Sequence, residues 1–169
     1  VTVIKQKDDA STVDEVASNI NFDYIKGTNV SPDSVTKNLP LPTGLDSDKS
    51  IVIEWTSSNE DVVKKNGEVV RPLPGEDDES VTLTAVVKKN YASSTPVIIE
   101  FDVKPFESVN ELLEEAKNSL KFSVLSNEEI NEVTCNLYLP DVWKYNTAVE
   151  WSCASPFVDI SGTEAIITR

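Results

Sequence analysis

The chain of 169 residues has no histidine, no methionine, two cysteines and five glycines. It has only 15 basic residues, against 29 acidic ones. Without histidine it lacks the side chain used most often for acid–base catalysis and metal binding near neutral pH. The net charge of −14 repels phosphate backbones and anionic lipids, which argues against nucleic-acid binding and against membrane surfaces. No apolar run approaches the roughly 18 residues that a membrane-spanning helix needs, so we expect no membrane insertion.

The start of the chain also lacks an initiating methionine and a signal peptide. This favours a mature product or a fragment of a longer protein. Val1 to Lys5 alternates apolar and polar residues, as a half-buried strand does. We therefore expect residues 1–7 to be the closing strand of a preceding unit or an N-terminal extension.

What the sequence does contain is a long internal repeat. Residues 11–71 pass from an amphipathic segment through a Leu-Pro step to a tryptophan-containing apolar run and then a Gly-to-Arg segment, and residues 108–169 repeat that order. The offset between the copies is 96 at Trp55 and Trp151. A period of this length indicates whole domains in tandem rather than the short units of a solenoid.

The repeat predicts two domains, at residues 8–105 and 106–169. The first copy continues for 33 residues past Arg71, and the second copy ends before any counterpart of that stretch. We therefore expect the second domain to be partial, without its last two strands.

Each copy is expected to open with a short helix. In the first, Ser11 to Ile20 places apolar residues on one face, and Ser11 or Thr12 is the expected N-cap. In the second, Ser108 begins the same capping pattern, with Glu111 three residues later.

After each helix the apolar period changes to two, which is typical of strands. The candidate strands of the first copy are Asn21–Ile25, Ser34–Leu41, Ser50–Ser57, Glu68–Arg71, Ser80–Lys88 and Pro96–Lys104. Those of the second copy are Lys121–Val124, Glu132–Leu139, Ala148–Cys153 and Ala165–Thr168. Short strands with turn signals about every ten residues predict an all-β chain of tandem immunoglobulin-like β-sandwich domains, each opened by a short helix.

Four motifs carry a family resemblance: Leu41-Pro42, Ile53-Glu54-Trp55-Thr56-Ser57-Ser58, Asn66-Gly67-Glu68-Val69-Val70-Arg71-Pro72 and Val81-Thr82-Leu83-Thr84-Ala85-Val86-Val87. Together they resemble the atrophied bacterial Ig-like domain over nearly all of residues 11–104. The second copy keeps Leu139-Pro140, Val149-Glu150-Trp151-Ser152, Gly162 and Arg169, but has Cys153 and Ala154 in place of the serine pair. The resemblance implies a non-catalytic module of secreted bacterial proteins, such as surface-layer chains, adhesins and polysaccharide-degrading enzymes, and it brings no catalytic residues.

Trp55 and Trp151 point inward by parity, and we expect both in the cores of their domains rather than in contact with a ligand. Arg71 and Arg169 end equivalent segments. We expect them to bind a carboxylate, with Glu54 and Glu150 as candidates, or backbone carbonyls.

Cys135 and Cys153 are the two cysteines of the chain, and both lie in the second copy. If both face the core, a disulfide would close an 18-residue loop and add roughly 3 kcal/mol on the chain-entropy model. Two buried thiols are the alternative.

Trp143 and Tyr145 form the best candidate for ligand binding, because exposed aromatic rings two residues apart could stack on sugars. A loop packed on its own domain is the competing interpretation, and the one we favour. Asp46, Asp48 and residues 76–79 could offer oxygen ligands to Ca²⁺, although a solvated acidic loop is favoured and no calcium motif is present.

The sequence therefore predicts a non-catalytic spacer or display module of a secreted or surface-bound bacterial protein, extracellular and without a cofactor. Its expected partners are neighbouring domains of a larger polypeptide, with polysaccharide or cell wall as a further possibility. The alternatives are a carbohydrate- or cell-wall-binding module, with Trp143 and Tyr145 as contacts, and an adhesin fragment that pairs through open strand edges. Enzymatic activity is not expected, because no nucleophile motif and no phosphate-binding loop is present.

Overall fold

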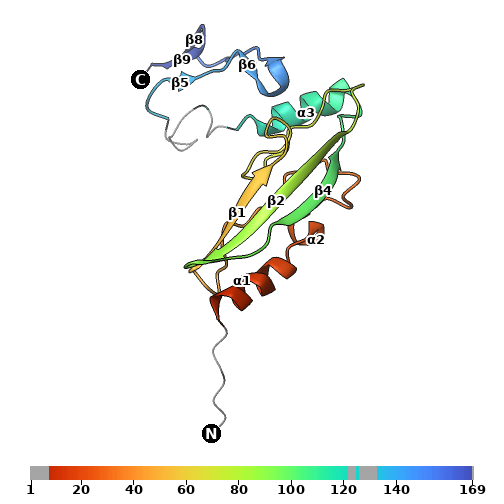
Figure 1. The fold of residues 1–169 in the computed structure, drawn as a ribbon. Coiled ribbons are helices and arrows are strands. Elements are labelled where there is room, and N and C mark those ends of the chain that lie inside the picture. Colours follow the sequence, from red (N-terminus) through yellow and green to blue (C-terminus); the bar gives the residue numbers. More distant parts are fainter. Residues whose placement is uncertain (1–7, 122–124, 126–132, 169) are drawn as a thin grey trace. The chain divides into compact units, whose positions relative to one another are not determined.

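The structure is a computed structural model, and it describes residues 8–121, 125 and 133–168 (Figure 1). The chain divides into two compact units, Val1–Phe106 and Glu107–Arg169. The strand predicted at Val1–Lys5 lies outside the described residues, as do nearly all of Lys121–Val124 and the start of Glu132–Leu139.

Unit 1 is built around one antiparallel sheet whose central strand is β2 (Figure 1). Its elements are α1 (Asp9–Ser18), α2 (Phe22–Ile25), β1 (Ile51–Ser57), β2 (Glu79–Lys89), β3 (Ala92–Ser93) and β4 (Val97–Val103). On one side β1 pairs with β2, so that Trp55 lies opposite Ala85, and on the other side β4 pairs with β2, so that Leu83 lies opposite Ile99. The predicted strands Ser50–Ser57, Ser80–Lys88 and Pro96–Lys104 are confirmed within a residue or two.

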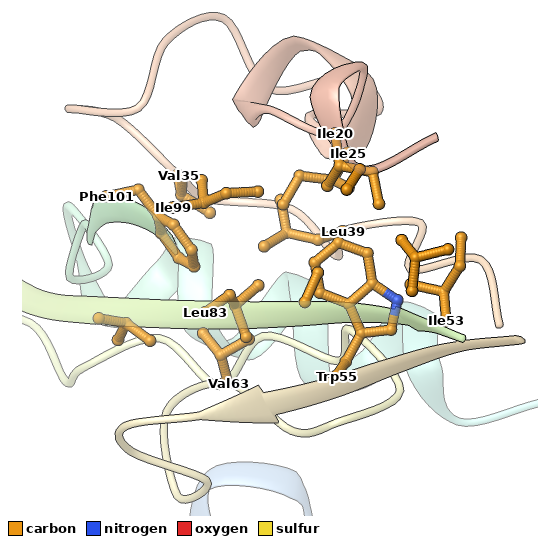
Figure 2. Close-up of a cluster of buried hydrophobic side chains, with 14 of the residues drawn as sticks. Ile20, Ile25, Val35, Leu39, Ile53, Trp55, Val63, Leu83, Ile99 and Phe101 are labelled. Atoms are coloured by element: carbon orange, nitrogen blue, oxygen red, sulfur yellow. The ribbon is translucent and has the colours of Figure 1, made fainter. Parts of the chain in front are cut away.

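Alternation along these strands sends one set of side chains into the core. Along β1, β2 and β4 the buried residues are Ile51, Ile53, Trp55, Val81, Leu83, Ala85, Val87, Ile99, Phe101 and Val103. Figure 2 shows Ile20 and Ile25, from the helical side, pointing toward Trp55 and Leu83 from the strands. Helices and irregular segments therefore supply the layer that covers the inner face of the sheet, and α1 packs against β2 and β3.

The first helix begins earlier than predicted. Its N-cap is Asp8, whose carboxylate accepts a hydrogen bond from the Ser11 amide at 2.7 Å. An aspartate at this position accepts a hydrogen bond from an otherwise unpaired amide of the first turn. Its negative charge also interacts favourably with the positive end of the helix dipole. The prediction of Ser11 or Thr12 as N-cap was therefore wrong by one turn.

The strand predicted at Asn21–Ile25 is also wrong, because Phe22–Ile25 is the helix α2. The Asn21 side chain accepts a hydrogen bond from the Tyr24 amide at 3.1 Å and so caps this helical turn. An asparagine cap can override an apolar period of two over so short a stretch.

The segments predicted as strands at Ser34–Leu41 and Glu68–Arg71 form only isolated bridges, Val35 to Val103 and Val63 to Val69. Asparagine side chains, one buried and one exposed, take the backbone bonds there. Asn29 accepts from the Thr36 and Lys37 amides, and Asn38 accepts from the Val69 amide, each at 2.9 Å. Amide side chains thus replace a ladder of strand hydrogen bonds.

Unit 2 has smaller sheets, one in the order β5-β9-β8 and one made of β6 and β7. Its elements are α3 (Val109–Ser119), β5 (Leu137–Tyr138), β6 (Val142–Trp143), the 3₁₀ helix η1 (Lys144–Asn146), β7 (Thr147–Ala148), β8 (Val158–Ser161) and β9 (Glu164–Ile167). As predicted, Ser108 caps α3 by accepting from the Glu111 amide at 3.2 Å.

The strand predicted at Ala148–Cys153 is largely wrong, since residues 149–153 lie in no strand. In unit 1 the corresponding strand β1 is paired along its length with β2. The described part of unit 2 has no counterpart of β2, and a strand without a neighbour to bond is not stable.

Candidate functional sites

Arg71 binds the last residues of unit 1, which follow β4. Its side chain is buried, with 4% exposed. Its Nε donates to the Lys104 carbonyl at 3.0 Å, and its Nη2 donates to the Pro105 carbonyl at 2.6 Å. The guanidinium lies 4.2 Å from the ring centre of Phe106, whose own amide donates to the Pro72 carbonyl. We call this group, formed by Arg71 with residues 104–106, the exit clamp.

The exit clamp decides between the two roles expected for Arg71. The side chain binds backbone carbonyls, because its planar set of donors matches two neighbouring oxygens. Glu54, the carboxylate proposed as its partner, instead accepts a hydrogen bond from Lys88 at 2.6 Å on the sheet. Arg169 lies outside the described residues.

The two tryptophans of the repeated motif form the same hydrogen bond. The indole Nε1 of Trp55 donates to the Pro42 carbonyl at 2.8 Å, and that of Trp151 donates to the Pro140 carbonyl at 2.8 Å. Trp55 is buried in the core, whereas Trp151 is half-buried. In both units the indole therefore ties the tryptophan segment to the Leu-Pro step.

The aromatic residues proposed as sugar contacts are bound to α3. The Nε1 of Trp143 donates to the Ser119 hydroxyl at 2.7 Å, and the Tyr145 hydroxyl donates to Glu115 at 2.5 Å. Both rings are half-buried. Their polar ends are engaged within unit 2, which is the arrangement of a packed loop.

A cavity of about 240 Å³ lies beside this loop. Its lining is mainly apolar and comes from α3 and from the segment after β6: Leu113, Ala116, Lys117, Leu120, Trp143, Thr147, Ala148, Val149 and Glu150. Trp143 therefore lines a cavity, whereas Tyr145 is not part of the lining.

The disulfide predicted between Cys135 and Cys153 is not formed, and both residues are exposed. The prediction took both residues to lie on strands with their side chains turned inward. Neither lies in a strand, so the alternation that would bring the sulfurs together does not apply. The Cys153 sulfur accepts a hydrogen bond from the Ser155 amide at 3.4 Å.

Asp46 and Asp48, two of the acidic residues considered for Ca²⁺, are engaged with neighbouring donors. Asp48 accepts from the Ser50 hydroxyl at 2.6 Å and from Lys89 at 2.9 Å, and these bonds, the Ser50 hydroxyl first, lower the pKa of Asp48 to about 2. The bond to Asp48 also raises the pKa of Lys89. Asp46 pairs with Lys49 at 2.6 Å. Across residues 8–121, 125 and 133–168, no group of three or more potential metal ligands occurs.

Asn29 is a structural residue that the sequence pattern did not indicate. Its side chain is buried and makes four hydrogen bonds, donating to the Lys26 and Lys37 carbonyls and accepting from the Thr36 and Lys37 amides. It thereby joins the turn that follows α2 to residues 36 and 37. The one available signal was an asparagine close to Gly27 and Pro32 in a turn-rich stretch.

The antiparallel sheet of unit 1 and the core that contains Trp55 are those expected of an immunoglobulin-like domain. The family model of the atrophied bacterial Ig domain matches residues 6–104. The chain therefore belongs to that family. No curated protein matches the chain.

Domains of this family are typically non-catalytic, and bacterial Ig-like domains are often extracellular or attached to the cell surface. The helices in the described part of the chain are all too short or too polar to cross a bilayer.

Proposed function

We propose that this chain is a non-catalytic spacer or display module of a secreted or surface-bound bacterial protein. The observation that carries the proposal is that the chain enters and leaves unit 1 at opposite ends of β2. At one end Asp9, in the first turn of α1, accepts from Asn90 at 2.8 Å, directly after β2. At the other end Val103, the last residue of β4, lies opposite Glu79. At ~3.3 Å per residue, β2 separates these points by roughly 33 Å.

The exit clamp supports the same function. It holds the carbonyls of Lys104 and Pro105, and Phe106 is buried. Glu107 is then the single residue before Ser108, the N-cap of α3. A spacer requires a short connection of this kind between its domains.

The partners expected for a spacer are neighbouring domains of the same polypeptide. In unit 2 the indole-to-carbonyl bond of Trp151 repeats that of Trp55. We take unit 2 to be a partial second copy of the same domain, so that the chain is a short tandem.

The stiffness of the joint is measurable by the distance distribution between spin labels in the two units. Labels would replace the exposed residues Val30 and Glu164 in a chain whose two cysteines are changed to serine. We expect one narrow distance peak, which becomes broad in Arg71→Ala although unit 1 stays folded by circular dichroism. A broad distribution in the unaltered joint would refute the spacer function.

A second candidate function is carbohydrate binding at unit 2, and the observation that favours it is the cavity beside Trp143. The test is electrophoretic retention on plant and bacterial-wall polysaccharides. A binding module should be retained on one polymer and released by Trp143→Ala, while Tyr24→Ala, at an exposed tyrosine of unit 1, should have no effect. Unretarded migration on every polymer would remove this candidate.

A further inference from the structure

We propose that the peptide between Asn66 and Gly67 is a site of spontaneous chemical modification, which the folded turn protects and which unfolding of unit 1 opens to reaction. In the unfolded chain Asn66 converts to aspartate or isoaspartate. The isoaspartate form does not fit the turn, so that unit 1 cannot refold. The proposal goes beyond the spacer function and is independent of it, because it concerns one turn inside unit 1.

Three hydrogen bonds fix this turn. The Gly67 amide donates to the Lys64 carbonyl at 2.8 Å, and the Lys64 amide donates to the Glu68 carbonyl at 2.9 Å. The Asn66 side-chain oxygen accepts from the Glu68 amide at 3.0 Å. Gly67 has a φ of +83°, which is typical of the glycine that closes a short hairpin loop. Asn66 is exposed to solvent, whereas Gly67 is buried.

An asparagine that precedes glycine is open to cyclisation, because glycine has no Cβ to hinder the attack. The Gly67 nitrogen attacks the side-chain carbonyl carbon of Asn66, so that a new carbon–nitrogen bond forms and the bond to the side-chain NH₂ group breaks. That group leaves as ammonia, with the proton that the Gly67 nitrogen loses. Water then adds to either carbonyl of the cyclic imide and gives aspartate or isoaspartate. Water is the co-reactant, and no atom is oxidised or reduced.

In the folded chain both reacting groups are already hydrogen-bonded. The proton that the Gly67 nitrogen must lose is bound to the Lys64 carbonyl, and the Asn66 side chain is turned toward the Glu68 amide. Cyclisation also requires rotation of the backbone between the two residues. The Gly67 carbonyl accepts from the Leu39 amide at 2.8 Å, which opposes that rotation. The reaction therefore requires the turn to open.

Isoaspartate does not fit the folded turn. Its main chain passes through the former side chain, which adds one backbone carbon, a bond length of about 1.5 Å, between residues 66 and 67. Gly67 has no room for an added atom, since a Cβ there would lie 1.8 Å from the Leu39 carbonyl oxygen. Val69, two residues later, is buried in the core and would be displaced with it. Aspartate keeps the length of the backbone and an oxygen for the Glu68 amide, so the turn can accept it.

The test of protection is peptide mapping by mass spectrometry, on the full chain held at mildly alkaline pH in buffer or in guanidinium chloride. Replacement of NH₂ by OH raises the mass of the fragment that contains Asn66, and chromatography separates aspartate from isoaspartate. We expect conversion to be at least about tenfold faster in the denaturant, because only the open turn reacts. Asn90, an exposed asparagine that precedes Tyr91, is the internal control and should convert slowly in both conditions.

The test of refolding follows the same chain after increasing times in guanidinium chloride. After dilution into buffer, the recovered fraction of folded chain is measured by circular dichroism, and we expect it to fall in step with the formation of isoaspartate. Asn66→Ser is the matched control, because a serine hydroxyl can accept from the Glu68 amide and has no side-chain amide to lose. Its recovery should stay constant over the same times. Asn66→Asp should refold as the unconverted chain does.

Three results would overturn the proposal. The first is equal conversion of Asn66 in buffer and in denaturant, which would mean that the turn gives no protection. The second is no isoaspartate in the unfolded chain. The third is a recovered fraction that falls equally in Asn66→Ser, or that stays constant while isoaspartate accumulates. None of these results concerns the joint between the units, so each would leave the spacer function to its own test.

Discussion

Replacing Arg71 by methionine tests the exit clamp, because methionine keeps the apolar stem and removes the charged head. The variant loses the hydrogen bonds to the Lys104 and Pro105 carbonyls and the contact with Phe106. Hydrogen bonds from a charged group contribute roughly 1.5–3 kcal/mol each, and a cation–π contact contributes roughly 0.5–2 kcal/mol. Because these contacts share one guanidinium they do not add, and we expect a loss of about 3 kcal/mol.

The loss can be measured by urea unfolding of the full chain, followed by the fluorescence of Trp55 after Trp143 and Trp151 are changed to phenylalanine. With a urea dependence of about 2 kcal/mol/M, the unfolding midpoint should fall by about 1.5 M. Lys26→Met is the control. It removes an ion pair to Asp23 whose carboxylate is exposed, and should change the midpoint by less than about 0.5 M. If Arg71→Met changes the midpoint no more than this control does, Arg71 does not hold the exit and the argument for a fixed joint fails.

Further expectations concern the core, one turn and one carboxylate. Trp55→Phe should cost about 2 kcal/mol in chemical unfolding and Trp151→Phe less than about 1 kcal/mol, since only the first indole is buried; equal costs would contradict this reading. Gly67→Ala should destabilise more than Gly75→Ala by roughly 1–3 kcal/mol, because both have positive φ but a Cβ at Gly67 would meet the Leu39 carbonyl at 1.8 Å. The pKa of Asp48 is about 2 in the folded chain and 3.8 without its donors, so its stabilisation is present above pH 3.8 and disappears toward pH 2. In Asp48→Asn the melting temperature should therefore change less with pH over this interval than in the unaltered chain. An unchanged dependence on pH would contradict this role of Asp48.

Long strands with regular alternation could be predicted from the sequence. The run from Val81 to Val87 alternates without interruption and is buried on one face, so its period alone predicted a strand there; its central place in the sheet could not be predicted in this way. Shorter segments were misread wherever an asparagine or aspartate side chain bonded the backbone. Asn21 caps a helical turn and Asn29 replaces strand bonds, and neither effect appears in an apolar period.

The candidate sites depend on contacts that sequence spacing does not encode. Tyr145 meets Glu115 thirty residues away, and Trp143 meets Ser119. From the sequence, a loop packed on its own domain was the favoured interpretation and exposed aromatics were the alternative, and in the structure both rings are bound to α3. The role of Arg71 was partly predictable, because its repeated position indicated a structural contact and left open which acceptor it binds.

The position of the exit clamp has a mechanical consequence. Tension applied through the chain would reach unit 1 at α1 and at residues 104–106, which lie at opposite ends of β2. A pull on β4 from Val103 would run along the strand, so the hydrogen bonds between β4 and β2 would be loaded together in shear rather than broken one at a time. Through its hydrogen bonds to the Lys104 and Pro105 carbonyls, Arg71 would transfer part of the same force to its own segment of unit 1. A domain loaded in shear in this way resists mechanical unfolding by a force applied at its two ends.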